Sequence, residues 1–118
     1  GLLLVTLPEA MPVNETLDLY ARLGDYQKQL GLCVLNEVHT APATPSQWAH
    51  ASPHLDVPEL LHAKKLADRH MGRIHRQEQA RERLSALPCP LVELPFLGHR
   101  DLKLADITQL ANQIEGAL

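Results

Sequence analysis

The sequence predicts an α/β domain built on a three-stranded parallel sheet, and three observations favour this class. The apolar run at 2–7 is typical of a strand that is covered on both faces, and 32–36 and 91–94 are two further candidate strands. Apolar residues at helical spacing fill the segments around them. The connection between the first two runs, over 14–30, is short and helical, which predicts parallel strands and a right-handed crossover. The expected order is strand, helix, strand, loop, long helix, strand and helix, a three-layer fragment of a larger doubly wound fold.

Length and composition restrict the class of protein further. A chain of 118 residues suits one domain, and 45% hydrophobic residues provide a core that Leu, Val, Ala and Ile must build, since only 3% are aromatic. The net charge of -3 argues against a basic nucleic-acid binder, and no apolar stretch approaches the ~20 residues of a membrane span. Gly1 stands directly on a strand-like run without a charged leader, so we expect no secretion signal, and we infer that the chain is a piece of a longer polypeptide. Cys33 and Cys89 are expected to be buried free thiols, as in a reducing compartment.

The first strand, helix and second strand are expected to place one loop at the sheet edge. Pro8 lacks an amide hydrogen, so strand pairing should fail there. Asn14 is a suitable helix cap, which leaves a loop from Pro8 to Asn14. The helix should run to about Leu30 and end at Gly31. Asn36 closes the second run, and because ligands bind beside the carboxyl ends of parallel strands, any site is expected at this edge.

A loop and a long helix are expected next. Residues 39–56 hold three prolines and no apolar period, which predicts a mobile loop anchored by Trp48. A helix over 57–86 should follow, capped by Asp56, and its apolar stripe thins between Ile74 and Leu84, where we expect the helix to protrude or pack thinly. The helix carries seven of the eleven Lys and Arg residues, but its interspersed acids and lack of stacking aromatic residues favour a solvated face over nucleic-acid binding.

The chain should close with a strand, a turn and a helix. Pro95 is expected to end the third strand, Gly98 to permit a turn over 96–100, and Asp101 to cap the last helix. The apolar stripe of that helix comprises Leu104, Ile107, Leu110, Ala111 and Ile114.

Motifs that would make this chain an enzyme on its own are absent from its sequence. It contains neither a GxxxxGK[ST] phosphate loop nor a GxGxxG motif, so the chain alone should not hydrolyse a nucleotide. The seven histidines are not accompanied by a CxxC pair, and no metal ligands are predicted. Glu9 and Glu15 flank one loop, which leaves general acid–base catalysis open, although helix capping explains both acids more simply.

The order of several short motifs resembles the arsenite-pump (ArsA-like) ATPase family, which includes the tail-anchored-protein targeting ATPases. A strand ends in Pro8-Glu9, Glu15-Thr16 opens a helix, and the next strand ends in Asn36. A variable loop, a long charged helix, a strand, the turn Pro95-Phe96-Leu97 and an amphipathic helix complete the pattern. The resemblance spans nearly the whole of 1–118 and implies the carboxyl-terminal portion of a P-loop NTPase domain of the SIMIBI type.

The resemblance also implies a ligand and partners. Asn36 would form hydrogen bonds with the edge of adenine, since a side-chain amide both donates and accepts such bonds. Pro95, Phe96 and Leu97 would contact the base and line its slot. The intact protein would be a cytoplasmic, homodimeric ATPase that binds ATP or ADP with Mg and drives a membrane pump subunit or the handover of a cargo protein. The phosphate loop and Mg ligands would belong to an amino-terminal half outside this chain. The loop after Asn36 has no CxxC pair, so a zinc-bridged dimer is not expected.

Two other classes of function stay open at this point. The chain could be a catalytically inactive interaction or regulatory module that docks through its long charged helix. It could also be a small α/β enzyme that uses Glu9 or Glu15. Under any of these interpretations, the unpaired edges of a three-stranded sheet predict dimerisation or strand exchange.

Overall fold

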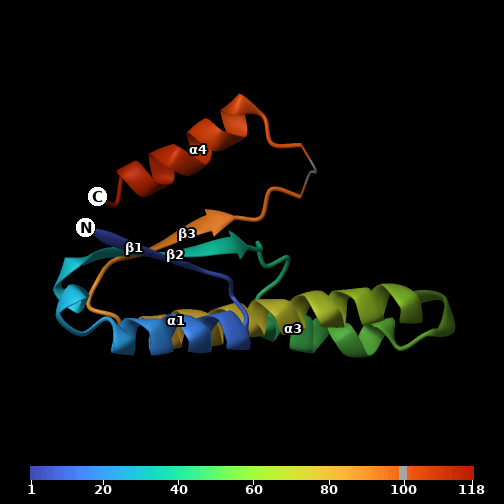
Figure 1. Cartoon of the computed structure of the whole chain (residues 1–118). Helices are drawn as coiled ribbons and strands as arrows, with labels where there is room; N and C mark the ends of the chain where they lie inside the picture. Colours follow the sequence, from blue (N-terminus) through green and yellow to red (C-terminus); the bar gives the residue numbers. More distant parts are fainter. Residues whose placement is uncertain (99–100) are drawn as a thin grey trace.

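The computed structural model of this chain describes residues 1–98 and 101–118 and has an α/β architecture (Figure 1). Its main elements are β1 (Leu2–Thr6), α1 (Ala10–Arg22), β2 (Leu30–Val38), α2 (Pro45–Ala51), α3 (Leu61–Leu84), β3 (Leu91–Pro95) and α4 (Leu104–Glu115). Short 3₁₀ helices occupy Gly24–Gln29, Ser52–Leu55 and Pro58–Leu60.

The three strands form one parallel sheet in the order β1-β2-β3, which confirms the predicted class and strand direction. Helices α1 and α3 lie against one face and α4 lies over the other, so the fold has three layers (Figure 1). Residues of β2 alternate between the two layers, because Cys33 and Leu35 pack on the α1/α3 side while Leu32 and Val34 pack on the α4 side. Full burial of such side chains stabilises a fold by about 1.5–3 kcal/mol each.

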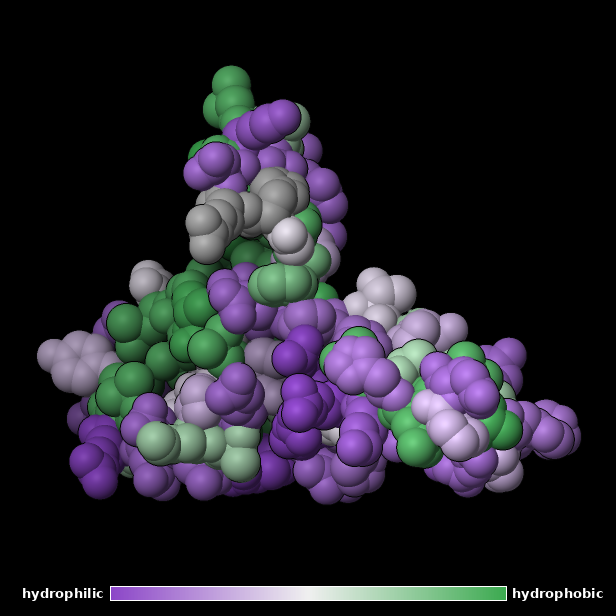
Figure 2. Space-filling model, turned by 90° about the vertical axis from the view of Figure 1, so that its right-hand side faces the viewer, coloured by the Kyte–Doolittle hydropathy of each residue, from purple (hydrophilic) through white to green (hydrophobic). Residues whose placement is uncertain are grey.

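Strand β1 is covered on one face only, contrary to the prediction for its apolar run. Leu3 is 45% exposed and Val5 is 58% exposed. The reason is that α4 packs against Leu94 of β3 and the adjacent residues of β2, and does not reach across to β1. Figure 2 shows hydrophobic side chains gathered at the surface below the ridge that α4 forms.

Helix α1 begins four residues earlier than predicted, so the loop from Pro8 to Asn14 is largely absent. The amide of Val13 donates to the carbonyl of Glu9 at 3.1 Å, which closes the first turn. Pro12 fits this turn because amides of a first turn have no partner within the helix. The helix also ends earlier than predicted, since Gly24 has a φ of +55°, a conformation that favours glycine. Gly31, the predicted helix end, lies inside β2.

The segment 39–56 contains a helix, so the prediction of a loop is wrong in its secondary structure. Thr44 and Gln47 form a reciprocal capping box, and Pro45 occupies the first turn of α2, where its missing amide has no cost. Trp48 anchors the segment as expected, because its indole Nε1 donates to Asp68 Oδ1 of α3 at 3.1 Å.

The packing along α3 is the reverse of the prediction. Ile74, Ala80 and Leu84 are buried against the sheet, and Gln77, which is only 1% exposed, fills the gap that the apolar stripe left. The amino-terminal half of α3 projects beyond the sheet together with α2 (Figure 1). This projection explains a radius of gyration of 17.4 Å, which exceeds the roughly 14 Å of a compact domain of this length.

The helix starts predicted at two aspartates are also shifted. Asp56 does not cap α3 but forms an ion pair with Lys64. Helix α4 starts after Lys103, whose amide donates to Asp106 Oδ2 at 2.8 Å, rather than at Asp101. Gly98 has a φ of +72°, consistent with the predicted turn, whose last two residues lie outside the described part of the chain.

Candidate functional site

The four residues that the sequence nominates for a base-binding slot line one cavity. Asn36, Pro95, Phe96 and Leu97 meet at the carboxyl edge of β2 and β3, around a volume of ≈ 270 Å³. The lining is completed by Glu37, Gly98, Leu102 and Leu110. We call this cavity the amide slot. Parallel pairing brings the residues together, because β2 and β3 end side by side.

A bulge at the end of β2 shapes the amide slot. The pairing of β2 with β3 is irregular between Leu35 and Val38, and the strand continues two residues beyond Asn36, which was expected to close it. Glu37 adopts a φ of 61° in this bulge, a left-handed conformation that costs a non-glycine residue about 1–3 kcal/mol. The amide of Phe96 still donates to the carbonyl of Val38 at 2.9 Å, which fixes the turn after β3 beside the bulge.

His39 supports Phe96 and was not singled out by the sequence analysis. Its ring stacks on the Phe96 ring with centroids 4.4 Å apart and an interplanar angle of 27°. The ring of His70 meets His39 edge-on at 5.9 Å. Burial, the Arg73 guanidinium and His70 lower the pKa of His39, while Glu37 opposes them. Its place in the sequence could have marked His39 as a site residue, because it directly follows the strand that ends at the expected site.

Gln77 holds the backbone that carries His39. Its side-chain Oε1 accepts from the His39 amide at 2.7 Å, and its Nε2 donates to the His39 carbonyl at 3.0 Å. A buried glutamine amide therefore links α3 to the end of β2. This role was missed because a glutamine on a charged helix has the same sequence signature as a solvent-facing residue.

A second cavity shares Phe96 and Glu37 with the amide slot and lies between the ends of β1 and β2 and helix α3. Its volume is ≈ 280 Å³, and it is lined by Leu7, Pro8, Glu9, Glu37, His39, Arg73, Arg76 and Phe96. We call it the charged cavity. Glu15, the partner suggested for Glu9 in acid–base catalysis, lies on an exposed face of α1 and lines neither cavity.

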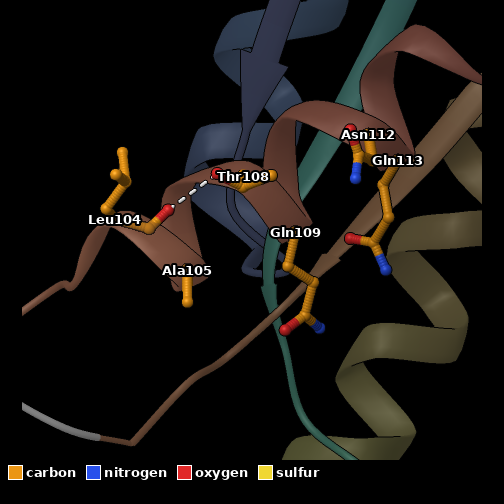
Figure 3. A pocket seen from close by; sticks show the side chains of 6 residues that line it. All are labelled: Leu104, Ala105, Thr108, Gln109, Asn112 and Gln113. Atoms are coloured by element: carbon orange, nitrogen blue, oxygen red, sulfur yellow. Dashed lines mark hydrogen bonds between the residues drawn. The ribbon is translucent and has the colours of Figure 1, made fainter.

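A broad, open hollow lies along α4 and defines no site. It measures ≈ 770 Å³, and its lining comes from one helix (Figure 3). Ala105, Gln109 and Gln113 extend from the same side of that helix, and Thr108 Oγ1 donates to the Leu104 carbonyl at 2.9 Å. Among the described residues, the lining contains no charged side chain and comes from α4 alone, so this surface offers no convergent chemistry.

The structure also bears on metals, membranes and cysteines. Among the described residues, no three His, Cys, Asp or Glu side chains are grouped so that they could hold a metal ion. None of the helices in the described part of the chain combines the length and apolar character needed to cross a membrane.

Both cysteines are free, with Cys33 buried and Cys89 half-buried. Burial, together with the neighbouring Cys89, raises the pKa of Cys33 to about 11.

No family model matches this chain, and no curated protein matches it. The resemblance to the arsenite-pump ATPases therefore stays a prediction that rests on the motifs quoted above.

Proposed function

We propose that this chain is the adenine-side, carboxyl-terminal portion of an ATPase similar to the arsenite-pump family. The observation that carries the proposal is the convergence of Asn36, Pro95, Phe96 and Leu97 around the amide slot. These residues come from the end of β2 and from the end of β3 with the turn that follows it, about 60 positions apart in the sequence. Their proximity is what the interpretation requires, and the carboxyl edge of a parallel sheet is where α/β folds bind ligands.

The chemistry of the amide slot suits a purine base. A side-chain amide such as that of Asn36 can accept from the amino group of adenine and donate to the adjacent ring nitrogen. Phe96 offers an aromatic ring, and stacking of a base on such a ring is worth about 1–3 kcal/mol. The volume of ≈ 270 Å³ lies just below the range of about 300–1,000 Å³ for pockets that hold a whole small molecule, which suits a slot for one part of a nucleotide.

In this proposal, the residues of this chain bind and orient the base, while phosphate chemistry belongs elsewhere. ATP or ADP with Mg would be held jointly with an amino-terminal half that carries the phosphate loop, since this sequence has no such loop. The intact protein would act in the cytoplasm as a homodimer, coupling ATP binding and hydrolysis to a membrane pump subunit or to cargo handover. A nucleic-acid partner is not part of the proposal.

Calorimetric titration of the chain with ADP and with adenosine tests the amide slot. We expect weak, saturable binding with similar affinity for both ligands, because this chain contacts the base rather than the phosphates. Asn36→Ala should weaken it about 5- to 150-fold, the equivalent of one bidentate base contact of about 1–3 kcal/mol. Asn14→Ala is the matched control, since Asn14 is exposed on α1 and should leave binding unchanged.

Two results would contradict the proposal. One is the absence of saturable binding by a chain shown to be folded by circular dichroism. The other is binding that Asn36→Ala leaves as tight as in the unchanged chain, which would place the ligand elsewhere.

The alternative function, an interaction module that docks through its long helix, is favoured by a separate observation. The projecting part of the molecule exposes apolar side chains at Val57, Leu60, Leu61 and Leu66. Such residues on a helix that leaves the sheet suit contact with another protein. The titration separates the two candidates, because a folded chain that binds neither ADP nor adenosine would leave docking through α3 as the better-supported function.

A further inference from the structure

The charged cavity is a second candidate site, distinct from the amide slot. The two cavities share Glu37 and Phe96, but the charged cavity opens toward α3 and the end of β1. Its volume of ≈ 280 Å³ suits a small ligand. None of its features depends on the proposed function.

Two arginines of α3 line this cavity without a partner. Arg73 and Arg76 are three residues apart, which places them on one face of the helix. Neither forms an ion pair or a hydrogen bond with any residue among 1–98 and 101–118. Arg81 of the same helix behaves differently, since it pairs with Glu93 through two nitrogens. The unpaired guanidiniums therefore present several N–H donors to the cavity.

Two carboxylates line the same cavity and are equally unpaired. The side chains of Glu9 and Glu37 make no ion pair or hydrogen bond within the described residues, although two arginines share the cavity with them. Glu37 is fixed in its left-handed conformation by the bulge of β2. The cavity thus offers separated donors and acceptors that do not satisfy one another.

Two arginines and two glutamates line the charged cavity, so their formal charges balance. Burial and the Arg73 guanidinium lower the pKa of His39, whereas Glu37 raises it, so groups of both signs act on this wall of the cavity. An anion bound to the two arginines would need a hydrogen-bond donor of its own to face a carboxylate.

We propose that the charged cavity binds hydrogen phosphate, with Arg73 and Arg76 donating to its oxygens and Glu37 accepting from its O–H. The planar guanidinium fork matches the spacing of phosphate oxygens. An ionised carboxylate only accepts hydrogen bonds, so it attracts an anion that carries a proton and repels one that does not. Sulfate has no proton near neutral pH, and a phosphate monoester, whose second pKa is about 6, has largely lost its proton by pH 7.5. Free hydrogen phosphate is therefore the preferred ligand.

The test is an amide-resonance NMR titration of the full chain at pH 7.5 and constant ionic strength, with inorganic phosphate, sulfate and methyl phosphate as separate probes. Constant ionic strength removes changes due to charge screening. We expect saturable shifts at residues 37–39 and on α3 near Arg73 with phosphate, and binding about tenfold weaker with the other two anions. Arg73→Gln and Arg76→Gln should each weaken phosphate binding about tenfold, the usual effect of one charged hydrogen bond.

Two further variants complete the design. Arg69→Gln is the matched control, because Arg69 is an exposed arginine of α3 outside the cavity lining, and it should leave the affinity unchanged. Glu37→Gln should remove the preference for phosphate over sulfate, because an amide no longer repels the unprotonated anion. The proposal is overturned if phosphate produces no saturable shifts, if Arg69→Gln weakens binding as much as Arg76→Gln, or if sulfate or methyl phosphate binds as tightly as phosphate.

Discussion

Replacing Gln77 tests whether a buried amide holds the candidate site in place. Gln77→Met keeps the length of the side chain but removes both hydrogen bonds to His39, at 2.7 Å and 3.0 Å. At about 1 kcal/mol for each bond, the free energy of unfolding should fall by about 2 kcal/mol. Gln77→Ala also removes a buried methylene worth about 0.8 kcal/mol, so its total loss should be about 3 kcal/mol.

The assay is urea unfolding followed by circular dichroism at 222 nm, with thermal unfolding as a second measure. A loss of 3 kcal/mol corresponds to a fall of roughly 10 °C in Tm for a domain of this size. Gln79→Ala is the control, because Gln79 lies two residues away on the exposed face of α3 and should change stability by less than about 0.5 kcal/mol. If Gln77→Met proves as stable as the unchanged chain, the bridge between α3 and β2 contributes nothing and the reasoning is wrong.

Two further predictions concern the core and the sheet edge. The pKa of Cys33 is raised to about 11 in the folded chain, so ionisation of this thiol opposes folding above the ordinary thiol pKa of about 8.5. The free energy of unfolding, measured by urea unfolding at each pH, should therefore fall by up to about 3 kcal/mol between pH 8 and pH 11. An equal fall in the variant Cys33→Ala would refute the assignment to Cys33. Leu3 and Val5 are exposed on β1, whose outer edge is unpaired, and they should promote self-association. Light scattering at high concentration should therefore detect dimers that the variant Leu3→Lys, Val5→Lys lacks, whereas a monodisperse monomer of the unchanged chain would contradict the expectation.

The sheet could be predicted from the sequence because strand and crossover signals are local. A strand formed by an apolar run such as 32–36 can bury both faces only inside a layered fold. The helical connection between the first two strands leaves few possible ways to arrange them in a sheet. The meeting of Asn36 with Phe96 followed from this parallel arrangement. Helix bounds were less predictable, since α1 starts before the expected cap at Asn14 and includes Pro12 in its first turn, where the missing amide costs nothing.

The part of the site around His39 could not be predicted, and the reason is tertiary. Gln77 and His39 are 38 positions apart, and nothing in either local pattern indicates that one satisfies the backbone of the other. The exposure of β1 was missed for a similar reason, because composition does not reveal that α4 stops short of Leu3 and Val5. Buried polar partners and the reach of a covering helix depend on packing between distant segments.

Phe96 and Glu37 each belong to two neighbouring cavities, and this sharing has a thermodynamic consequence. A ligand that shifts either side chain in one cavity alters the wall of the other and changes the free energy of the second binding event. Linkage requires that any such effect be equal in both directions. A base bound in the amide slot and an oxyanion bound in the charged cavity would therefore change each other's affinity without touching.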